Sequence, residues 1–271
     1  MLFCFGYGYV AQFIGDRGTS RSSQGKGKFL YKGGSLSKDI CEAVERANFA
    51  LISIPPQEDG DLLIPFIKDA FSSFSHLKWI GYLSSTSVYG NHHGAWVDEN
   101  ALTHPTSRQG TSRLKAEKQW LELDLPIHIF RLAGIYGPGR NILHDLKAGR
   151  AQRIFKKGTV FSRIHVADIV QALKASMNNP NPGRIYNIAD NLPAPAHEVL
   201  AYGAELLGVE PPPLIPYEEA ILSPLGHSFY QDSKRVNNKR LLDELIPSLL
   251  FPSYKEGLRN LLEKDSLENI I

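Results

Sequence analysis

The first residues of the chain have the pattern of an anion-binding turn. A short apolar run, Met1–Phe5, ends in Gly-x-Gly-x-x-Ala at Gly6–Ala11. In a strand–turn–helix unit the first glycine permits a tight turn, and the second removes a Cβ that would hold a phosphate away. The first N–H groups of the helix and its dipole then face the anion. We predict that this turn binds the pyrophosphate of a dinucleotide; an ordinary glycine-rich turn is the alternative. The predicted contacts are Gly6, Tyr7, Gly8, Tyr9, Val10 and Ala11.

The segment after this turn is unusually short for a dinucleotide-binding unit. Gly15–Gly18 interrupts the helical pattern, so either the first helix is cut short or the second strand is displaced. That strand ends near Arg21, or it covers residues 28–31 and ends at Lys32. Both alternatives put a basic residue where the adenosine ribose would lie, and a basic residue suits the 2′-phosphate of NADP. We therefore predict NADP as cofactor with Arg21 as a contact. NAD stays open, and a solvated arginine is the alternative.

Hydrophobic periodicity predicts the elements that position these residues. Residues 36–47 have the apolar spacing of an amphipathic helix, and residues 49–54 that of a strand buried on both faces. A helix over 62–74 and a strand over 79–84 follow. Ligands of open parallel sheets bind beyond the carboxyl ends of the strands. We therefore predict that Ser53, Ile54 and Pro55 line the cofactor site.

Several segments, in order along the chain, resemble the motifs of one family. Leu83–Gly90 resembles a Ser-Ser-x-x-Val-Tyr-Gly motif, and Gln109–Glu117 resembles a Tyr-Gly-x-Ser-Lys-x-x-Ala-Glu helix. Further matches are Arg131–Asn141, Arg163–Asp168 and Ile185–Ala189. These motifs belong to the extended short-chain dehydrogenases, the NAD(P)-dependent epimerase/dehydratase group. Residues 233–238 and 251–258 resemble the tail of an atypical bacterial subgroup that lacks the catalytic tyrosine.

The resemblance implies a catalytic arrangement that this sequence does not fully keep. In active members a tyrosine phenol transfers the proton, a lysine one helical turn later lowers its pKa and binds the nicotinamide ribose, and a serine binds the substrate oxygen. The matching positions are Ser85 for the serine, Gln109 for the tyrosine and Arg113 for the lysine. An amide exchanges no proton at a useful pH, and a guanidinium is not interchangeable with an ammonium. The other register, with Thr111 and Lys115 in these roles, also lacks a tyrosine and loses the Ala-Glu match.

Other polar residues are candidates for the same site. Tyr136 lies in a motif with which the family shapes its nicotinamide and substrate cleft, so we expect a cofactor contact and, less strongly, an acid/base role. For Tyr89 and Tyr136, packing is the favoured alternative. Arg140 and Arg163 are candidates for binding a substrate phosphate or carboxylate, and His92 for bordering the substrate. Each has a solvated or ion-paired alternative, and no ligand spacing predicts a metal site.

Composition limits the classes of function. The chain has 271 residues, 42% of them hydrophobic and 21% charged, with a formal net charge of +2. This balance is typical of ordinary globular proteins and gives no reason to expect a nucleic acid or an anionic membrane as partner. We find no signal peptide and no apolar run of spanning length, so we expect a cytoplasmic protein. Cys4 and Cys41 indicate neither a disulfide framework nor a zinc site.

Together these patterns predict an α/β fold: a doubly wound parallel Rossmann sheet with a small, mainly helical C-terminal cap. We expect a dinucleotide-binding domain over 1–137 plus 165–190 and a substrate-binding cap over 138–164 plus 191–271. The predicted function is NAD(P)-dependent hydride transfer on a hydroxyl or carbonyl of a nucleotide-sugar-like substrate. The alternatives are a catalytically inactive NADP(H)-binding sensor and a scaffold that no longer binds a dinucleotide. The resemblance also implies a homodimer.

Overall fold

The computed structural model describes residues 1–15, 17–22, 27–69 and 74–268. The chain divides into two compact units. Unit 1 consists of Met1–Val88, Ser107–Leu132 and Ile169–Tyr186, and unit 2 of Tyr89–Thr106, Ala133–Asp168 and Asn187–Ile271. The domain boundaries expected from the sequence stay a prediction.

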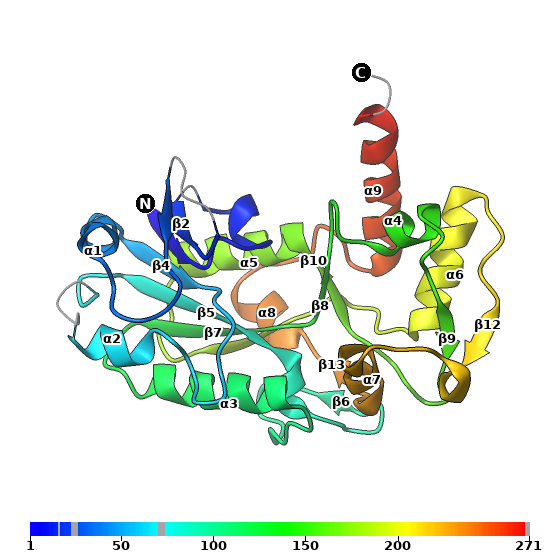
Figure 1. Ribbon diagram of the computed structural model, residues 1–271, viewed down its shortest axis with the longest axis horizontal. Coiled ribbons are helices and arrows are strands. Elements are labelled where there is room, and N and C mark those ends of the chain that lie inside the picture. The colour runs from blue at the N-terminus through cyan, green and yellow to red at the C-terminus, as the bar shows by residue number, and fades with distance from the viewer. Residues whose placement is uncertain (16, 23–26, 70–73, 269–271) are drawn as a thin grey trace. The chain divides into compact units, whose positions relative to one another are not determined.

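Unit 1 is built on a seven-stranded sheet with the order β11-β7-β5-β4-β1-β2-β3 (Figure 1). The pairings from β3 through to β7 are parallel. The strands are β1 (Leu2–Phe5), β2 (Arg17–Ser20), β3 (Lys28–Leu30), β4 (Phe49–Ile52), β5 (Trp79–Ser85), β7 (Ile127–Leu132) and β11 (Ile185–Ile188). The strand order reverses direction next to β1, as in a doubly wound dinucleotide-binding sheet. The predicted parallel Rossmann sheet is confirmed.

Helices cover both faces of this sheet because its buried strands are apolar on both sides. Phe3 and Phe5 point into a core that also contains residues of α1 (Lys38–Glu45), α2 (Ile64–Asp69) and α3 (Arg108–Leu121). On the opposite face the indole Nε1 of Trp79 donates a hydrogen bond of 2.9 Å to Ser176 Oγ of α5 (Val166–Asn178). Figure 1 shows α2 and α3 on one side of the sheet and α5 on the other.

The second strand is the one that ends near Arg21: β2 lies directly beside β1 and ends just before that residue. The other candidate segment is also a strand, β3, and it lies on the outer side of β2. The first helix, in contrast, is reduced to η1, a three-residue 3₁₀ turn at Ala11–Phe13. The alternative in which the first helix is cut short is therefore the one that the structure has. One short turn aligns too few peptide units to produce the helix dipole expected behind the glycine turn.

Two glycines permit this short connection. A Cβ on Gly18 would lie 2.2 Å from the carbonyl oxygen of Cys4, its partner in the β1–β2 register. A Cβ on Gly15 would lie 2.5 Å from Cys4 Sγ. The chain packs directly on β1 at both positions, where a full crossover would place a helix, and only glycine fits so close an approach.

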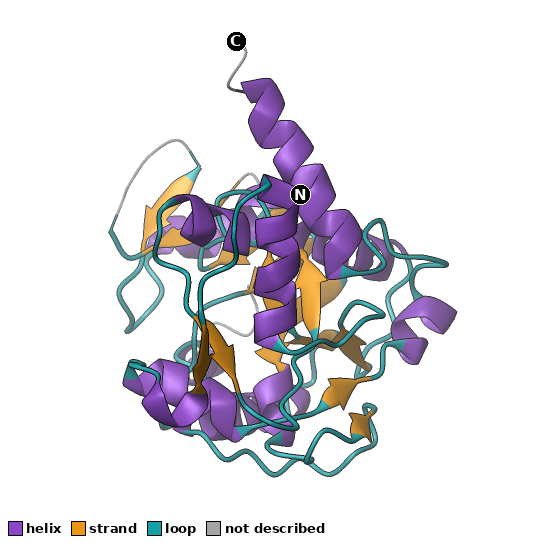
Figure 2. Ribbon diagram, turned by 90° about the vertical axis from the view of Figure 1, so that its right-hand side faces the viewer, coloured by secondary structure: helices purple, strands orange, loops and turns teal. Residues whose placement is uncertain are grey.

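Unit 2 combines short strands with helices (Figure 2). Its strands form the two-stranded sheets β8–β10, β9–β12 and β6–β13. The strands are β6 (Trp96–Val97), β8 (Gly134–Tyr136), β9 (Arg153–Phe155), β10 (Arg163–His165), β12 (Leu214–Pro216) and β13 (Arg235–Val236). The helices are α4 (Ile142–Lys147), α6 (Ala196–Leu207), α7 (Pro224–Gln231), α8 (Lys239–Glu244) and α9 (Tyr254–Glu268). Side chains of α4, α6 and α9 pack around Tyr136 in one apolar cluster.

We predict that Gly18→Ala lowers the free energy of unfolding by about 2–4 kcal/mol, because the new methyl group overlaps backbone that cannot move aside. Urea unfolding measures the change. The matched control is Gly8→Ala, whose Cβ would meet nothing within 4 Å and which should stay within about 1 kcal/mol of the wild type. Equal stability of the two variants would contradict the close packing of Gly18 on Cys4.

Candidate functional site

The glycine turn lies against the end of the neighbouring strand. Gly6 has a φ of +91°, a conformation that favours glycine. A Cβ on Gly6 would lie 2.9 Å from the backbone nitrogen of Ile54 and 3.0 Å from the carbonyl carbon of Ser53. The Ser53 N–H also donates to the Phe5 carbonyl at 2.8 Å. The structure thus brings together Gly6, Ser53 and Ile54, as the sequence predicts, at the carboxyl ends of β1 and β4.

Backbone donors of the turn are used within the protein. The Gly6 N–H donates to Thr19 Oγ1 at 2.9 Å, and the Tyr7 N–H donates to the Thr19 carbonyl at 2.7 Å. The Gly8 N–H donates to the Gly6 carbonyl at 2.8 Å. Thr19 of β2 therefore anchors the turn, a role for which the sequence carries no signal. An anion at this turn has to obtain donors and charge from other groups.

Gly8 differs from Gly6 because no packing requires it. It is exposed, and a Cβ placed on it would have no heavy atom within 4 Å. Its φ lies outside the left-handed region, so backbone strain does not require glycine either. A side chain there would instead fill the open space in front of the turn, which is where a dinucleotide-binding sheet receives the pyrophosphate.

The side chain of Tyr7 folds back over the turn. Its hydroxyl donates to the Gly15 carbonyl at 2.5 Å and closes the short connection. The Lys28 ammonium of β3 lies 5.1 Å from the centre of the Tyr7 ring, within the range of a cation–π contact. Sequence reasoning missed Lys28, because only the pairing of β3 with β2 brings it to the turn.

The other predicted cofactor residues are either packed or exposed. The Tyr9 ring lies edge-on to Phe13 with centroids 5.3 Å apart, and Val10 and Ala11 are buried. Arg21 is exposed and directly follows β2. Pro55 is exposed beyond the end of β4. The packed side chains stabilise the turn, and the exposed ones lie at strand ends where a ligand of the sheet is expected.

Helix α3 carries the two altered family positions. It begins after Ser107, whose hydroxyl oxygen accepts a hydrogen bond of 3.1 Å from the Gly110 N–H as an N-cap. Gln109 lies exposed in the first turn. The Arg113 guanidinium donates from Nη1 to the Leu83 carbonyl at 2.5 Å and lies 5.9 Å from the Tyr82 ring centre. Arg113 is thus bound to β5 of its own sheet.

A buried carboxyl group, that of Asp61, interacts electrostatically with Arg113. Asp61 is 4% exposed, and its Oδ1 accepts a hydrogen bond of 2.9 Å from the Leu63 N–H. Burial raises the pKa of the Asp61 carboxyl above its ordinary value, and the nearby charge of Arg113 opposes that rise. Burial likewise raises the pKa of the Tyr82 phenol. Neither group is identifiable from the sequence, since Asp61 follows other acidic residues, Tyr82 lies within an apolar strand, and no motif marks either one.

A buried ion pair fixes α3 against the sheet. The Arg131 guanidinium donates to Glu117 Oε2 at 2.8 Å, with side chains only 5% and 2% exposed. The Ser84 hydroxyl donates to Glu117 Oε1 at 2.5 Å. The next residue, Ser85, is partly exposed, and its hydroxyl oxygen accepts a bond of 3.1 Å from the Ser87 N–H. Ser84 therefore has a structural role, while Ser85 is a partly exposed residue at the carboxyl end of β5.

The two tyrosine candidates in unit 2 are packed. The Tyr136 hydroxyl donates to the Ser253 carbonyl at 3.4 Å, and a Cβ on Gly257 of α9 would lie 2.1 Å from that hydroxyl. Burial raises the pKa of Tyr136 above its ordinary value. The Tyr89 hydroxyl donates to Asn187 Oδ1 at 2.7 Å in a buried contact. Both environments favour the packing alternative over proton transfer.

Arg163 interacts with the backbone and with a buried carboxyl group. Its Nη1 donates to the carbonyls of Phe161 and Ala194, each at 2.9 Å. Burial raises the pKa of Asp190 to about 7, against the opposing charge of Arg163. Asp190 Oδ1 accepts a hydrogen bond of 3.1 Å from the Leu192 N–H. The substrate role predicted for Arg163 stays a prediction.

The remaining substrate candidates lie on loops of unit 2. The His92 N–H donates to the Ser233 carbonyl at 3.0 Å, and its Nε2 lies 3.2 Å from the Tyr89 carbonyl oxygen. Arg140 is exposed at the end of a tight turn in which its backbone exchanges hydrogen bonds of 2.9 and 3.0 Å with Gly137. Their substrate roles also stay predictions.

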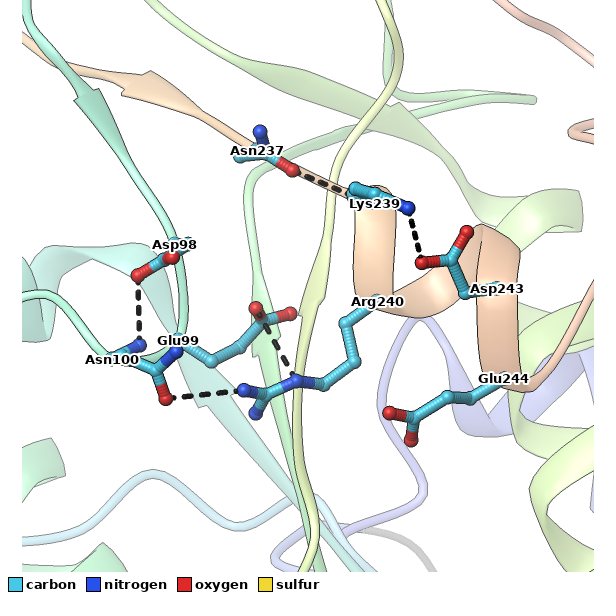
Figure 3. Close-up of a pocket in the computed structure, with 8 residues that line it drawn as sticks. All are labelled: Asp98, Glu99, Asn100, Asn237, Lys239, Arg240, Asp243 and Glu244. Atoms are coloured by element: carbon cyan, nitrogen blue, oxygen red, sulfur yellow. Dashed lines mark hydrogen bonds and ion pairs between the residues drawn. The ribbon is translucent and has the colours of Figure 1, made fainter.

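Unit 2 contains a polar hollow of about 230 Å³ that includes none of the predicted site residues (Figure 3). Its lining is Asp98, Glu99, Asn100, Asn237, Lys239, Arg240, Asp243 and Glu244. Lys239 and Asp243 pair at 2.5 Å, and Arg240 Nε lies 3.6 Å from Glu99 Oε2. Within the described ranges, no cluster of three histidine, cysteine or acidic side chains could hold a metal ion. No helix in the described part of the chain is long and apolar enough to cross a membrane.

Comparison with known proteins identifies relatives of the chain. The profile of the NAD dependent epimerase/dehydratase family matches residues 6–189. Protein YeeZ of Escherichia coli K12 is 31% identical over 186 residues, which cover 64% of each protein and so less than two thirds of YeeZ. The structure of a functionally unknown conserved protein from Silicibacter pomeroyi is 40% identical, with a TM-score of 0.87 over 97% of this chain and 98% of that one. MoeE5 in complex with UDP-glucuronic acid and NAD shares the fold at 18% identity, with a TM-score of 0.74 over 98% and 99% of the two chains.

We predict that the stability of unit 2 decreases as pH rises, because of Asp190. Its folded-state pKa of about 7 lies above the ordinary value of 3.8, so the stabilising contribution of the neutral carboxyl is complete below about pH 4. It is lost as pH rises through 7. Asp190→Asn keeps an acceptor for Leu192 without the charge. Burial also raises the pKa of Asp168 to about 6, so the variant keeps part of the effect. Between pH 5 and 8, urea unfolding should show a loss of stability that is about 1–4 kcal/mol larger in the wild type than in this variant. The control is Asp124→Asn at an exposed position, which should show the same pH dependence of stability as the wild type. An identical pH profile of all three proteins would refute the assignment of the effect to Asp190.

Proposed function

The chain belongs to the NAD dependent epimerase/dehydratase family, and we propose that unit 1 binds a nicotinamide dinucleotide without the family's tyrosine–lysine proton transfer. The observation that carries the proposal is the pair Gly6 and Gly8. Packing and backbone conformation require glycine at position 6, whereas at position 8 the missing Cβ leaves open space. A pyrophosphate at the carboxyl end of β1 would use that space.

NADP is the proposed form of the cofactor. In a sheet of this type, the residues at the end of the strand next to β1 contact the adenosine ribose. Here that strand is β2, and Arg21 and Ser22 directly follow it. An arginine suits the 2′-phosphate of NADP, while neither of these two residues has a carboxylate to bind the free 2′-hydroxyl of NAD.

The positions for acid/base chemistry support binding without turnover. Gln109 offers an amide, which exchanges no proton at neutral pH. Arg113 keeps a positive charge, but its guanidinium is bound to the Leu83 carbonyl and interacts electrostatically with the Asp61 carboxyl. A bound nicotinamide could accept or donate a hydride, yet these two residues provide no matching proton. We therefore propose an NADP(H)-binding sensor whose occupancy follows the NADPH/NADP⁺ ratio.

One observation favours a second candidate, hydride transfer on a hydroxyl or carbonyl of a nucleotide-sugar-like substrate. Ser85 is a partly exposed serine at the end of β5, at the family position that binds the substrate oxygen. The UDP-sugar acid and NAD named for MoeE5 agree with this class of substrate. In this candidate Ser85 orients the substrate and another acid replaces the missing phenol.

We predict that the wild type binds NADPH more tightly than NADH in calorimetric titration. Gly8→Ala should lower the affinity for both by at least about tenfold, because its methyl group would occupy the space of the pyrophosphate. Its melting temperature should match that of the wild type, since the methyl group meets no protein atom within 4 Å. Absence of binding to the wild type would refute the proposal, and unchanged affinity of Gly8→Ala would refute this placement of the pyrophosphate.

We also predict that the protein with NADPH bound shows no change in nicotinamide absorbance across a panel of carbonyl compounds and nucleotide sugars. Turnover of any compound would establish the second candidate instead. The variant Gln109→Tyr with Arg113→Lys then tests the reason for inactivity, because it restores the family pair. If this variant still binds cofactor and stays inert, the missing pair is not the reason.

A further inference from the structure

Binding a pyrophosphate at this turn poses an electrostatic problem. In dinucleotide-binding folds, the helix after the glycine turn offers free N–H groups and a positive dipole end to the two phosphate charges. Here η1 has three residues, and the N–H groups of Gly6, Tyr7 and Gly8 donate to Thr19 and to Gly6 itself. These three N–H groups and a full helix dipole are therefore not available to a ligand, and a side-chain cation can supply the charge instead.

Lys28 is placed to supply it. The short connections bring β3 beside β2, with Lys28 opposite Gly18 and Gly18 opposite Cys4 of β1. From there the Lys28 side chain reaches the middle residue of the Gly-x-Gly sequence, with Nζ 5.1 Å from the centre of the Tyr7 ring. The Tyr7 hydroxyl is itself bound to Gly15 at 2.5 Å, so the ring is a fixed support for the ammonium.

We propose that Lys28 binds the pyrophosphate of the dinucleotide and replaces the missing helix dipole as its counter-charge; this inference rests on the proposed function. A lysine suits this role because its ammonium is a compact charge on a flexible stem. It can exchange the Tyr7 ring for a phosphate oxygen without rearranging the backbone. The exposed position of Lys28 leaves the ammonium accessible to a ligand in solution.

The role differs from that proposed for Arg21. Substituting a residue that binds the pyrophosphate changes the affinity for NADH and NADPH equally, since both contain that group. Substituting a residue that binds the 2′-phosphate changes the affinity for NADPH alone. The two assignments therefore separate when both dinucleotides are titrated against the same variants.

The test compares Lys28→Gln, Lys28→Arg, Arg21→Gln and Lys32→Gln with the wild type by calorimetric titration of NADH and NADPH at low and high salt. If Lys28 makes an exposed charge contact with the pyrophosphate, Lys28→Gln should lower the affinity for both dinucleotides by a similar factor of about five to ten at low salt. The loss should shrink at high salt because counterions screen the contact. Lys28→Arg keeps the charge and should retain most of the affinity. Lys32→Gln, which removes an exposed lysine just beyond the same strand, should leave NADH binding unchanged.

The outcomes separate the inference from the function on which it rests. If the wild type binds neither dinucleotide, the proposed function and the inference both fail. If the wild type binds and Lys28→Gln binds as tightly, the inference alone fails. A loss confined to NADPH would assign Lys28 to the 2′-phosphate and also overturn the inference. Thermal melting of each variant shows whether a loss of affinity reflects unfolding.

Discussion

The glycine turn depends on the direct packing of Gly15 and Gly18 on Cys4. With Cβ positions that would lie 2.5 Å from Cys4 Sγ and 2.2 Å from its carbonyl oxygen, these two residues allow β2 to follow β1 without a full helix between them. The short connection places Thr19 under the turn, where it accepts hydrogen bonds from the Gly6 and Tyr7 N–H groups. A close approach of backbone to backbone thus determines both the shape of the turn and the donors that a ligand can use.

The second constraint is the buried ion pair between Glu117 and Arg131. It joins α3 to β7 and, through the Ser84 hydroxyl, to β5. Removing one partner would leave an uncompensated charge in the core, so this contact stabilises α3 whatever chemistry the helix carries. The altered positions Gln109 and Arg113 lie on the same helix, and Arg113 adds its own contact with the Leu83 carbonyl. The helix therefore keeps its place although its surface no longer has the family's acid/base pair.

The sequence predicts the parts of the fold that apolar runs encode. The strands at Phe49–Ile52 and Trp79–Ser85 are continuous apolar or small-residue segments, and the structure has both of them in one sheet. The shortening of the helix after Ala11 could also be expected, because Gly15–Gly18 interrupts the helical pattern, and the structure reduces that helix to Ala11–Phe13. Thr19 and Lys28, in contrast, escaped prediction. Their roles arise from strand pairing, and nothing in their local sequence separates them from ordinary exposed polar residues.

Binding and proton transfer rely on different elements of unit 1, which is why one can be lost without the other. The turn is shaped by β1, β2 and β4 through Gly6, Thr19 and Ser53, whereas the acid/base positions lie on α3. A substitution on α3 that keeps the Glu117–Arg131 pair leaves the turn intact. The reverse also holds, since shortening the first helix leaves α3 unchanged but removes a dipole that any pyrophosphate at the turn would otherwise use. Lys28, the side-chain cation proposed to replace that dipole, is exposed, so mobile ions screen its charge. On this proposal, the affinity for a dinucleotide should fall as the ionic strength rises.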